Sequence, residues 1–288
     1  MTSIVRCRTA TTGTHLRLMQ AGGATSALPG TLAELLRLTA SDFRATLDIA
    51  ANAPLFGPAA FTLLAPIDGE TEVWAAGVTY KRSQEARVEE SSTPDIYTRV
   101  YEAARPEIFF KATQRRVAGP GAQVVVRADS TWDVPEPEVA IVVNAHAEIV
   151  GYTIANDVSS RSIEGDNPLY LPQAKVYDGS CALGPGIVPA WEVADPYALG
   201  IRMRIHRAGG VYWSGATSMR EFARRFNDLV TALFLEDTFP DGVILSTGTA
   251  LVPDSTFTLE AGDDVEIEID TLGSLRNPVV RGKASRRR

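Results

Sequence analysis

Residues 136–157 read EPEVAIVVNAHAEIVGYTIAND, with one apolar run after Glu138 and a second run that ends near Asp157. Short runs of β-branched and aromatic residues on both sides of a polar turn are typical of a β-hairpin. Similar short runs, divided by Gly, Pro, Asp and Asn, recur between about residue 72 and residue 269. This spacing predicts a mostly β domain.

The register of this hairpin decides which acidic side chains meet. If Ala145 lies opposite Glu148, the same register continues to the open end of the hairpin. There Glu136 faces Asp157, and Glu138 projects from the same face, because side chains two apart on a strand point the same way. An isolated Glu-x-Glu pair is more often a solvated face, and a slip of one residue would move Asp157 to the opposite face. Three convergent carboxylates favour an oxygen-liganded cation, so we predict a site for Mg²⁺, Mn²⁺ or Ca²⁺.

The chain divides into two predicted units. In residues 1–70, leucines recur at helical spacing after Gly30, which indicates a small separate domain. Residues 71–288 carry the short strands and one long helix, predicted to begin at Ser218. Ser218-Met-Arg-Glu221 has the spacing of a capping box, and apolar residues follow it along one helical face.

Composition narrows the class of protein. The chain has 288 residues, 45% of them hydrophobic, and a net charge of -7, which argues against a nucleic-acid partner. Two distant cysteines suggest neither a disulfide framework nor a thiolate metal site. The sequence shows no long apolar span and no signal-peptide pattern. We therefore expect a soluble cytoplasmic protein without a membrane or nucleic-acid partner.

Other residues are weaker candidates for a binding site. Lys175 lies in a largely uncharged stretch, where it could bind an anionic substrate or simply extend along the surface. Arg161 and Glu164 follow Asp157 at helical spacing, so a helical turn would place them near it, although such pairs are often surface ion pairs. Ser246-Thr-Gly-Thr249 could bind a carboxylate or form an ordinary turn. Residues 81–93 form either an exposed helix or a loop.

Several common catalytic motifs are missing. The sequence has no GxGxxG after a strand, no GxxxxGK[ST] and no GxSxG, and its three histidines are too scattered for an HExxH motif. A nicotinamide or phosphate-loop site is therefore not expected.

Taken together, a set of segments resembles the fumarylacetoacetate hydrolase family from about Gly77 to Pro253. They are Gly77-Val-Thr-Tyr80, Phe110-Lys111, Gly119-Pro-Gly121, Glu136-x-Glu138, Gly151 to Arg161, Lys175, Leu183-Gly-Pro185 and Ser246-Thr-Gly-Thr249. The resemblance implies a mainly β (α+β) fold, with a C-terminal mixed β-roll domain, a smaller N-terminal α/β domain, and a homodimer.

The same resemblance assigns roles to site residues. It implies that Glu136, Glu138 and Asp157 bind Mg²⁺ or a similar ion. It also implies substrate contacts at Arg161, Glu164, Lys175 and Thr249.

Three departures from the family pattern bear on the reaction. C–C bond hydrolases of the family carry a histidine at the position of Ser83 to activate water, and an asparagine at the position of Thr79. Ser162 also replaces an aspartate that is common after the family's arginine. The resemblance therefore favours an activity that does not need a histidine-activated water.

Residues 77–87 and 163–177 resemble a branch of the family that contains sugar-acid dehydratases. The implied enzyme is a lyase (hydro-lyase) that dehydrates a 2-keto-3-deoxy sugar acid through a metal-stabilised enolate. An example is 2-keto-3-deoxy-D-arabinonate, which gives 2,5-dioxopentanoate in pentose catabolism. A C–C bond hydrolase of a 2,4-diketo acid (an acylpyruvate or diketo-deoxy sugar acid) and an oxaloacetate-type decarboxylase are the alternatives. The non-enzymatic alternative is a binding protein without catalytic activity.

For dehydration, we expect Lys175 to support the enolate or take the C3 proton. Glu90, in residues 81–93, is our candidate for the acid that releases the C4 hydroxyl. Tyr80, Arg82 and Ser83 are expected to contact substrate, and the segment from Lys81 to Thr93 is expected to close over it.

Overall fold

The predicted hairpin is present as β10 (Pro137–Val143) and β11 (Ile149–Asp157) in a computed structural model that describes residues 1–9, 13–57, 61–90 and 94–286. Glu138 lies opposite Ala155, as predicted. The Asp157 N–H donates to the carbonyl of Glu136 across 3.0 Å, which continues that register. The register at the open end of the hairpin, which carries the three carboxylates, is therefore confirmed.

The turn end of the hairpin differs from the prediction. A register shift lies between Val142 and Val143, and the Asn144 N–H donates to the Glu148 carbonyl at 3.0 Å. The predicted pairing of Ala145 with Glu148 is therefore wrong. The Asn144 side chain provides the physical reason, because its Oδ1 accepts the N–H groups of His146 and Glu148 and organises a bulged turn.

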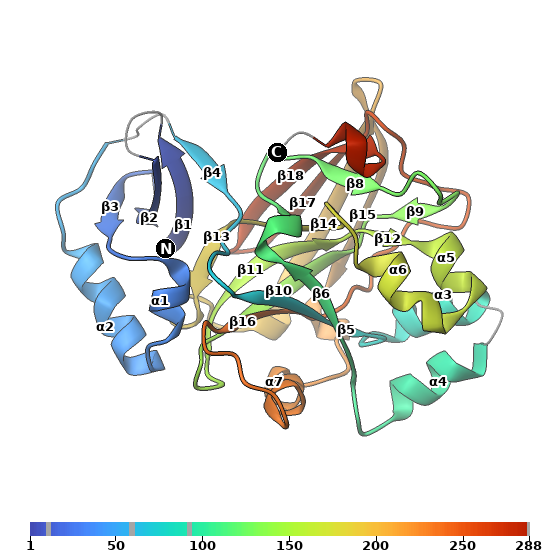
Figure 1. Ribbon diagram of the computed structural model, residues 1–288, viewed down its shortest axis with the longest axis horizontal. Helices are drawn as coiled ribbons and strands as arrows, with labels where there is room; N and C mark the ends of the chain where they lie inside the picture. Colours follow the sequence, from blue (N-terminus) through green and yellow to red (C-terminus); the bar gives the residue numbers. More distant parts are fainter. Residues whose placement is uncertain (10–12, 58–60, 91–93, 287–288) are drawn as a thin grey trace.

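The hairpin lies inside a large mixed sheet (Figure 1). Its strand order is β3 (Thr25–Leu28), β2 (Gly13–Gln20), β1 (Thr2–Thr9), β13 (Cys181–Pro189), β11, β10, β16 (Val243–Ser246), β5 (Glu72–Gly77) and β6 (Glu107–Thr113). Off this path, β4 (Thr62–Leu64) pairs with β1 and β7 (Val117–Ala118) pairs with β13.

A second sheet packs against the first. Its order is β15 (Gly210–Ser218), β14 (Gly200–Arg207), β17 (Asp264–Ile269), β18 (Gly273–Arg281) and β8 (Val124–Val126). A short separate pair joins β9 (Asp133–Val134) to β12 (Ser159–Ser160).

β10 is buried on both faces, which explains its unbroken apolar sequence. Val139, Ile141 and Val143 pack into the core that also holds residues of the second sheet. Ala140 and Val142 point the other way, into the core shared with the N-terminal helices. The start of β10, which carries Glu138, is therefore held from both sides.

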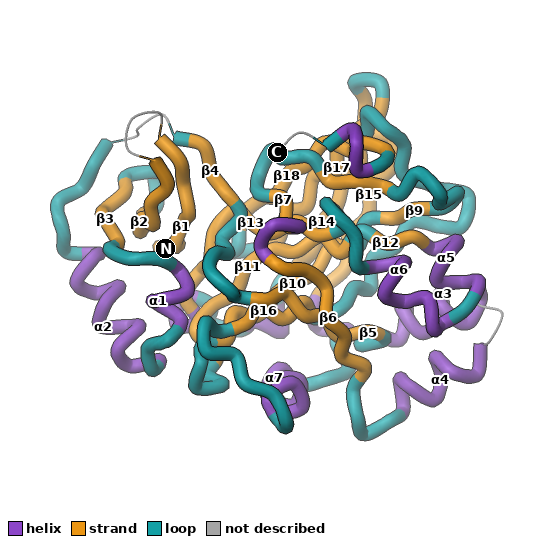
Figure 2. The backbone as a smooth tube through the Cα atoms, viewed as in Figure 1, coloured by secondary structure: helices purple, strands orange, loops and turns teal. Residues whose placement is uncertain are grey.

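The N-terminal strands continue the large sheet, because β1 pairs with β13. Helices α1 (Leu32–Leu36) and α2 (Ala40–Ala51) pack in this part of the molecule (Figures 1 and 2). The boundary at residue 70 remains a prediction, since strands on both sides of it share one sheet.

The other helices lie mostly at the opposite end of the view (Figure 2). They are α3 (Lys81–Glu90), α4 (Pro94–Glu102), α5 (Arg161–Asp166), α6 (Leu171–Lys175) and α7 (Phe226–Phe234). Short 3₁₀ turns are η1 (Gln114–Arg116), η2 (Pro168–Tyr170), η3 (Ala190–Glu192), η4 (Pro196–Ala198), η5 (Met219–Glu221) and η6 (Lys283–Ser285). Among the described residues, no helix has the length and apolar character needed to cross a bilayer.

The prediction of a helix from Ser218 is wrong. Ser218 ends β15, its hydroxyl accepts the Arg220 N–H in a 3₁₀ turn, and the helix begins only at Phe226. The cause is tertiary: Phe222 forms a β-bridge with Tyr80, which holds the intervening backbone extended. The predicted apolar face is nevertheless core, because Phe226, Leu229, Val230 and Leu233 are buried.

Candidate active site with a carboxylate cluster

Glu136, Glu138 and Asp157 converge at the open end of the hairpin. One carboxylate oxygen from each lies within 4.8 Å of the others, and all three residues are at most 3% exposed. Such burial is unfavourable for three like charges unless cations or hydrogen bonds compensate them. The surrounding residues provide that compensation.

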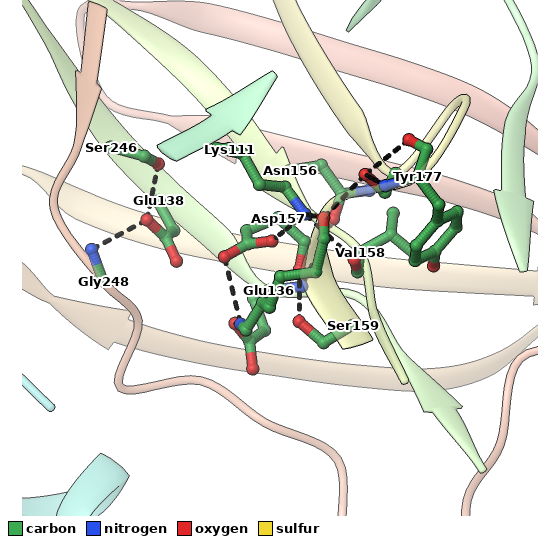
Figure 3. Close-up of polar contacts among 12 residues, drawn as sticks. Lys111, Glu136, Glu138, Asn156, Asp157, Val158, Ser159, Tyr177, Ser246 and Gly248 are labelled. Atoms are coloured by element: carbon green, nitrogen blue, oxygen red, sulfur yellow. Dashed lines mark hydrogen bonds and ion pairs between the residues drawn. The ribbon is translucent and has the colours of Figure 1, made fainter. Parts of the chain in front are cut away.

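Glu138 is held by donors from the neighbouring strand β16 and the loop after it (Figure 3). Its Oε2 accepts the Ser246 hydroxyl at 2.5 Å and the Gly248 N–H at 2.7 Å. Burial, followed by the negative charges of Asp157 and Glu136, raises the pKa of Glu138 to about 8. The cluster therefore favours a bound proton or cation at Glu138.

Two basic side chains neutralise Glu136. Lys175, at the end of α6, donates to Glu136 Oε2 at 2.5 Å and to Asp157 Oδ2 at 3.0 Å. Arg161, at the start of α5, donates from Nη2 to Glu136 Oε1 at 2.9 Å. The helical turn predicted after Asp157 is thus present and begins at Arg161, with the Ser160 hydroxyl capping it.

A third cation was not assigned a role from the sequence. Lys111 on β6 is 1% exposed and forms an ion pair with Asp157 Oδ1 (Figure 3). Its signal in the sequence is a lysine inside the apolar run Ile108-Phe-Phe-Lys111, where a charge needs a buried partner.

The cluster opens on a small cavity of about 20 Å³. The side chains and backbone that line it come from several elements. They are Ala76, Gly77, Val78, Ser83, Tyr97, Glu107, Phe109, Glu136, Glu138, Asp157, Glu164, Leu171, Lys175, Gly248 and Thr249.

The cavity wall has a strained residue. Val78 has φ +51°, a left-handed conformation that a β-branched residue rarely adopts. Such strain is typical of binding and active sites, where the surrounding structure enforces it. Beside it, Gly77 packs so closely on the Glu107 carboxylate that an added Cβ would lie 2.1 Å from Oε2. Glu107 is a second residue that sequence reasoning missed, because its strand partner Gly77 reveals it only in the fold.

The donor set fits a divalent metal ion. Three buried carboxylates supply hard oxygen ligands from one end of a rigid hairpin, which is the chemistry preferred by Mg²⁺, Mn²⁺ and Ca²⁺. Ser246 and Gly248 orient Glu138, and Arg161 orients Glu136. Hydrogen-bonded ligands of this kind are a usual feature of metal sites.

The structure brings only some of the predicted substrate-contact residues to the cavity. Ser83, Glu164, Lys175 and Thr249 line it, whereas Arg161 is not among its lining residues. Thr249 is 4% exposed, and its hydroxyl accepts the Leu251 N–H at 3.0 Å. Glu164 is 5% exposed.

Tyr80 and Arg82 lie elsewhere. The Tyr80 hydroxyl contacts Met219 Sδ at 2.8 Å in the core, its ring packs on Phe222, and burial raises its pKa. The Arg82 side chain is 62% exposed, and its Nη1 lies 4.0 Å from Glu85 Oε2. Neither position supports the predicted substrate contact, because the β-bridge at Tyr80 turns the ring inward and α3 turns Arg82 outward. The backbone of Glu90 ends α3, but the side chain expected to act as an acid lies outside the described residues, as do residues 91–93.

The chain is similar to known proteins in sequence and in fold. Residues 72–280 match the family described as fumarylacetoacetate (FAA) hydrolase C-terminal. A "Probable 2-keto-3-deoxyxylonate dehydratase" of Haloferax volcanii is 53% identical over 214 residues, 74% of this chain and 73% of that protein. A 2-dehydro-3-deoxy-D-arabinonate dehydratase of Saccharolobus solfataricus is 45% identical over 218 residues, again 74% of this chain and 73% of that protein. A solved structure of 2-keto-3-deoxy-D-arabinonate dehydratase complexed with magnesium and 2,5-dioxopentanoate has a TM-score of 0.85 and 34% identity. That alignment covers 98% of this chain and 99% of the other.

The family match includes the carboxylate cluster and all three cations around it. The predicted fold class, a mainly β domain with a smaller N-terminal α/β part, is confirmed. The resemblance stated from the sequence is confirmed as well: the chain belongs to the fumarylacetoacetate hydrolase family.

Proposed function

We propose that this protein is a metal-dependent lyase that dehydrates a 2-keto-3-deoxy sugar acid, converting a 2-keto-3-deoxypentonate to 2,5-dioxopentanoate. The observation that carries the proposal is the composition of the cavity, which combines the buried carboxylate trio with Lys175 and with Ser83. The chain's three histidines, His15, His146 and His206, are all described, and none lines the cavity. A hydrolase of this family would need a histidine at the position of Ser83 to activate water, whereas dehydration consumes no water and does not need that histidine.

The reaction removes a proton from C3 and the hydroxyl from C4. Glu136, Glu138 and Asp157 would hold Mg²⁺, which supplies Lewis acidity that stabilises the negative charge developing on a 2-keto acid. Lys175 donates to two carboxylates, so it is placed to act as a charged ammonium that favours the same negative charge. Since the product aldehyde lies at C5, further proton transfers among C3, C4 and C5 follow the loss of water.

A base and an acid are also required. Glu107 and Glu164 are the carboxylates outside the trio that line the described cavity. We assign the proton transfers to these two residues, with Glu107 as our choice for the acid that protonates the leaving hydroxyl. The role of Glu90 as the acid stays a prediction, because its side chain lies outside the described residues.

Substrate entry requires movement of the cavity wall. A volume of about 20 Å³ holds about one water molecule and excludes a five-carbon sugar acid. Ser83 on α3, Tyr97 on α4 and Leu171 on α6 cover the carboxylates from three short helices. We propose that these helices form the lid that admits the substrate and then excludes water.

The test is a substrate panel with purified protein and Mg²⁺. We expect 2-keto-3-deoxypentonates to release a semialdehyde, detected with a carbonyl reagent or by NMR. An acylpyruvate and oxaloacetate serve as the comparison substrates. Turnover of either of these, together with no turnover of any 2-keto-3-deoxy acid, would refute the proposal in favour of the hydrolase or decarboxylase.

We further propose that the protein acts as a cytoplasmic homodimer in pentose catabolism. Cys7 and Cys181 are both buried free thiols, which suits a reducing compartment. The dimer rests on the family resemblance. Light scattering coupled to size-exclusion chromatography measures the mass in solution, and a monomer at working concentration would contradict it.

A further inference from the structure

Lys111 is a buried charge that the proposed reaction does not use. It is 1% exposed, among the largest fully buried side chains, and it does not line the cavity. Removing an ammonium group from water costs several kcal/mol unless charged and polar partners replace the water. The position of Lys111 is therefore set by what its ammonium group contacts.

Three polar groups surround the ammonium, one through an ion pair and two through hydrogen bonds. Lys111 forms an ion pair with Asp157 Oδ1, donates to the Val158 carbonyl at 3.2 Å, and donates to the Lys175 carbonyl at 2.5 Å. Figure 3 shows the side chain directed at Asp157 and Val158. One ammonium group thus joins β6, the end of β11 and the end of α6.

The bridge ends at Asp157, a proposed metal ligand, and at Lys175, a proposed catalytic residue. Asp157 directs Oδ1 to Lys111 while its Oδ2 accepts from Lys175. The Lys175 carbonyl accepts from Lys111 and also from the Ser180 hydroxyl at 2.8 Å. The rotamer of Asp157 and the backbone from which the Lys175 side chain projects are therefore fixed by the same group.

We propose that Lys111 is a positioning residue: it holds Asp157 in the orientation needed for metal binding and holds the Lys175 backbone so that its ammonium group reaches the substrate. The part that concerns Lys175 rests on the proposed function. The part that concerns Asp157 rests only on the metal site.

The alternative is that Lys111 merely supplies positive charge. The two roles predict opposite changes in metal affinity. If Lys111 were only a counter-charge, its removal would make the pocket more negative and strengthen Mg²⁺ binding. If it positions a ligand, its removal weakens Mg²⁺ binding, by about 10–100-fold for a residue that orients a metal ligand.

The experiment compares Lys111→Met, Lys111→Arg and Arg207→Met with wild type in Mg²⁺ titrations by calorimetry, after circular dichroism confirms folding. Arg207 on β14 is a matched control in the other sheet, because it pairs with the buried Asp263 through two 2.7 Å contacts and donates to the Thr258 carbonyl at 2.9 Å. We expect Lys111→Met to bind Mg²⁺ about 10–100-fold more weakly. Arg207→Met should lose stability but keep its Mg²⁺ affinity within about twofold, since its hydrogen bonds go to Glu260, Asp263 and Thr258 and to no residue of the cluster.

Lys111→Arg keeps the charge but replaces a compact ammonium with a planar fork that cannot meet the same three acceptors. We expect its Mg²⁺ affinity to remain several-fold below wild type, so this variant decides the question even if Lys111→Met does not fold. Unchanged or tighter Mg²⁺ binding in either variant would overturn the proposal.

Kinetics at saturating Mg²⁺ test the part of the proposal that concerns Lys175. A misplaced Lys175 should lower kcat of Lys111→Met far more than it changes KM, whereas kcat of Arg207→Met should stay near wild type. An unchanged kcat in Lys111→Met would overturn the role of Lys111 toward Lys175. If wild type itself turns over no 2-keto-3-deoxy acid, the proposed function fails, while the Mg²⁺ titrations still decide the role of Lys111 toward Asp157.

Discussion

Replacing Glu138 with glutamine is expected to stabilise the metal-free protein while abolishing its response to Mg²⁺. The substitution keeps the volume of the side chain, and the amide oxygen can still accept from Ser246 and Gly248. What changes is the charge, because Glu138→Gln removes one of three carboxylates that repel each other in a buried cluster.

The magnitude follows from the pKa of Glu138, which is raised from 4.5 to about 8. A carboxyl whose pKa is raised on folding contributes stability that is present below about pH 4.5 and is lost as the pH rises through about 8. At roughly 1.4 kcal/mol per pKa unit, ionised Glu138 destabilises the fold by an amount on the order of 5 kcal/mol. Glu138→Gln removes this cost, so its advantage over wild type should grow between about pH 4.5 and 8.

The assay is thermal unfolding followed by circular dichroism across this pH range, in a chelator and then in saturating Mg²⁺. In the chelator, Glu138→Gln should melt above wild type by up to roughly 10 °C at the alkaline end. Added Mg²⁺ should raise the Tm of wild type and leave that of the variant nearly unchanged. The reasoning is refuted if the metal-free variant melts below wild type at alkaline pH, or if Mg²⁺ stabilises both proteins equally.

Three further outcomes are expected. Tyr80→Phe should leave kcat/KM within about twofold of wild type and change stability by about 1 kcal/mol or less, because within the described part of the chain the hydroxyl bonds to Met219 in the core. A large rise in KM would restore the substrate contact predicted from the sequence. Gly77→Ala places a Cβ 2.1 Å from Glu107 Oε2 and displaces that carboxylate. We therefore expect at least about a tenfold loss of kcat with a small change in Tm. A normal kcat would show that Glu107 takes no part in the mechanism. A chelator should abolish turnover and Mg²⁺ should restore it, whereas full activity after exhaustive dialysis against the chelator would contradict a metal-dependent reaction.

The convergence of the three carboxylates was predictable because strand periodicity is a local property. Once Glu138 is paired with Ala155 and the Asp157 N–H donates to the Glu136 carbonyl, the positions of the three carboxylates follow from alternation alone. The bulge at Val142 did not spoil the inference, since it lies between the turn and the ligands and changes only the pairing nearer the turn.

What the sequence did not reveal depends on contacts between distant segments. Lys111 acts on Asp157 and Lys175 across long sequence separations, so no spacing pattern identifies it. The supposed helix from Ser218 satisfied every local rule, yet the bridge between Phe222 and Tyr80 delays it to Phe226. Tertiary pairing overrode local propensity in that case, and it also turned Tyr80 away from the cavity.

The burial of β10 on both faces has a consequence for how this protein can change over time. Amide protons on that strand should exchange with solvent only through near-global unfolding, so the Glu138 carboxylate that it carries lies on the most persistent part of the fold. The residues that face the ligands from α3, α4 and α6 belong to short peripheral helices instead. If these helices form the proposed lid, substitutions in them can alter which acid is accepted while the carboxylate cluster below stays the same.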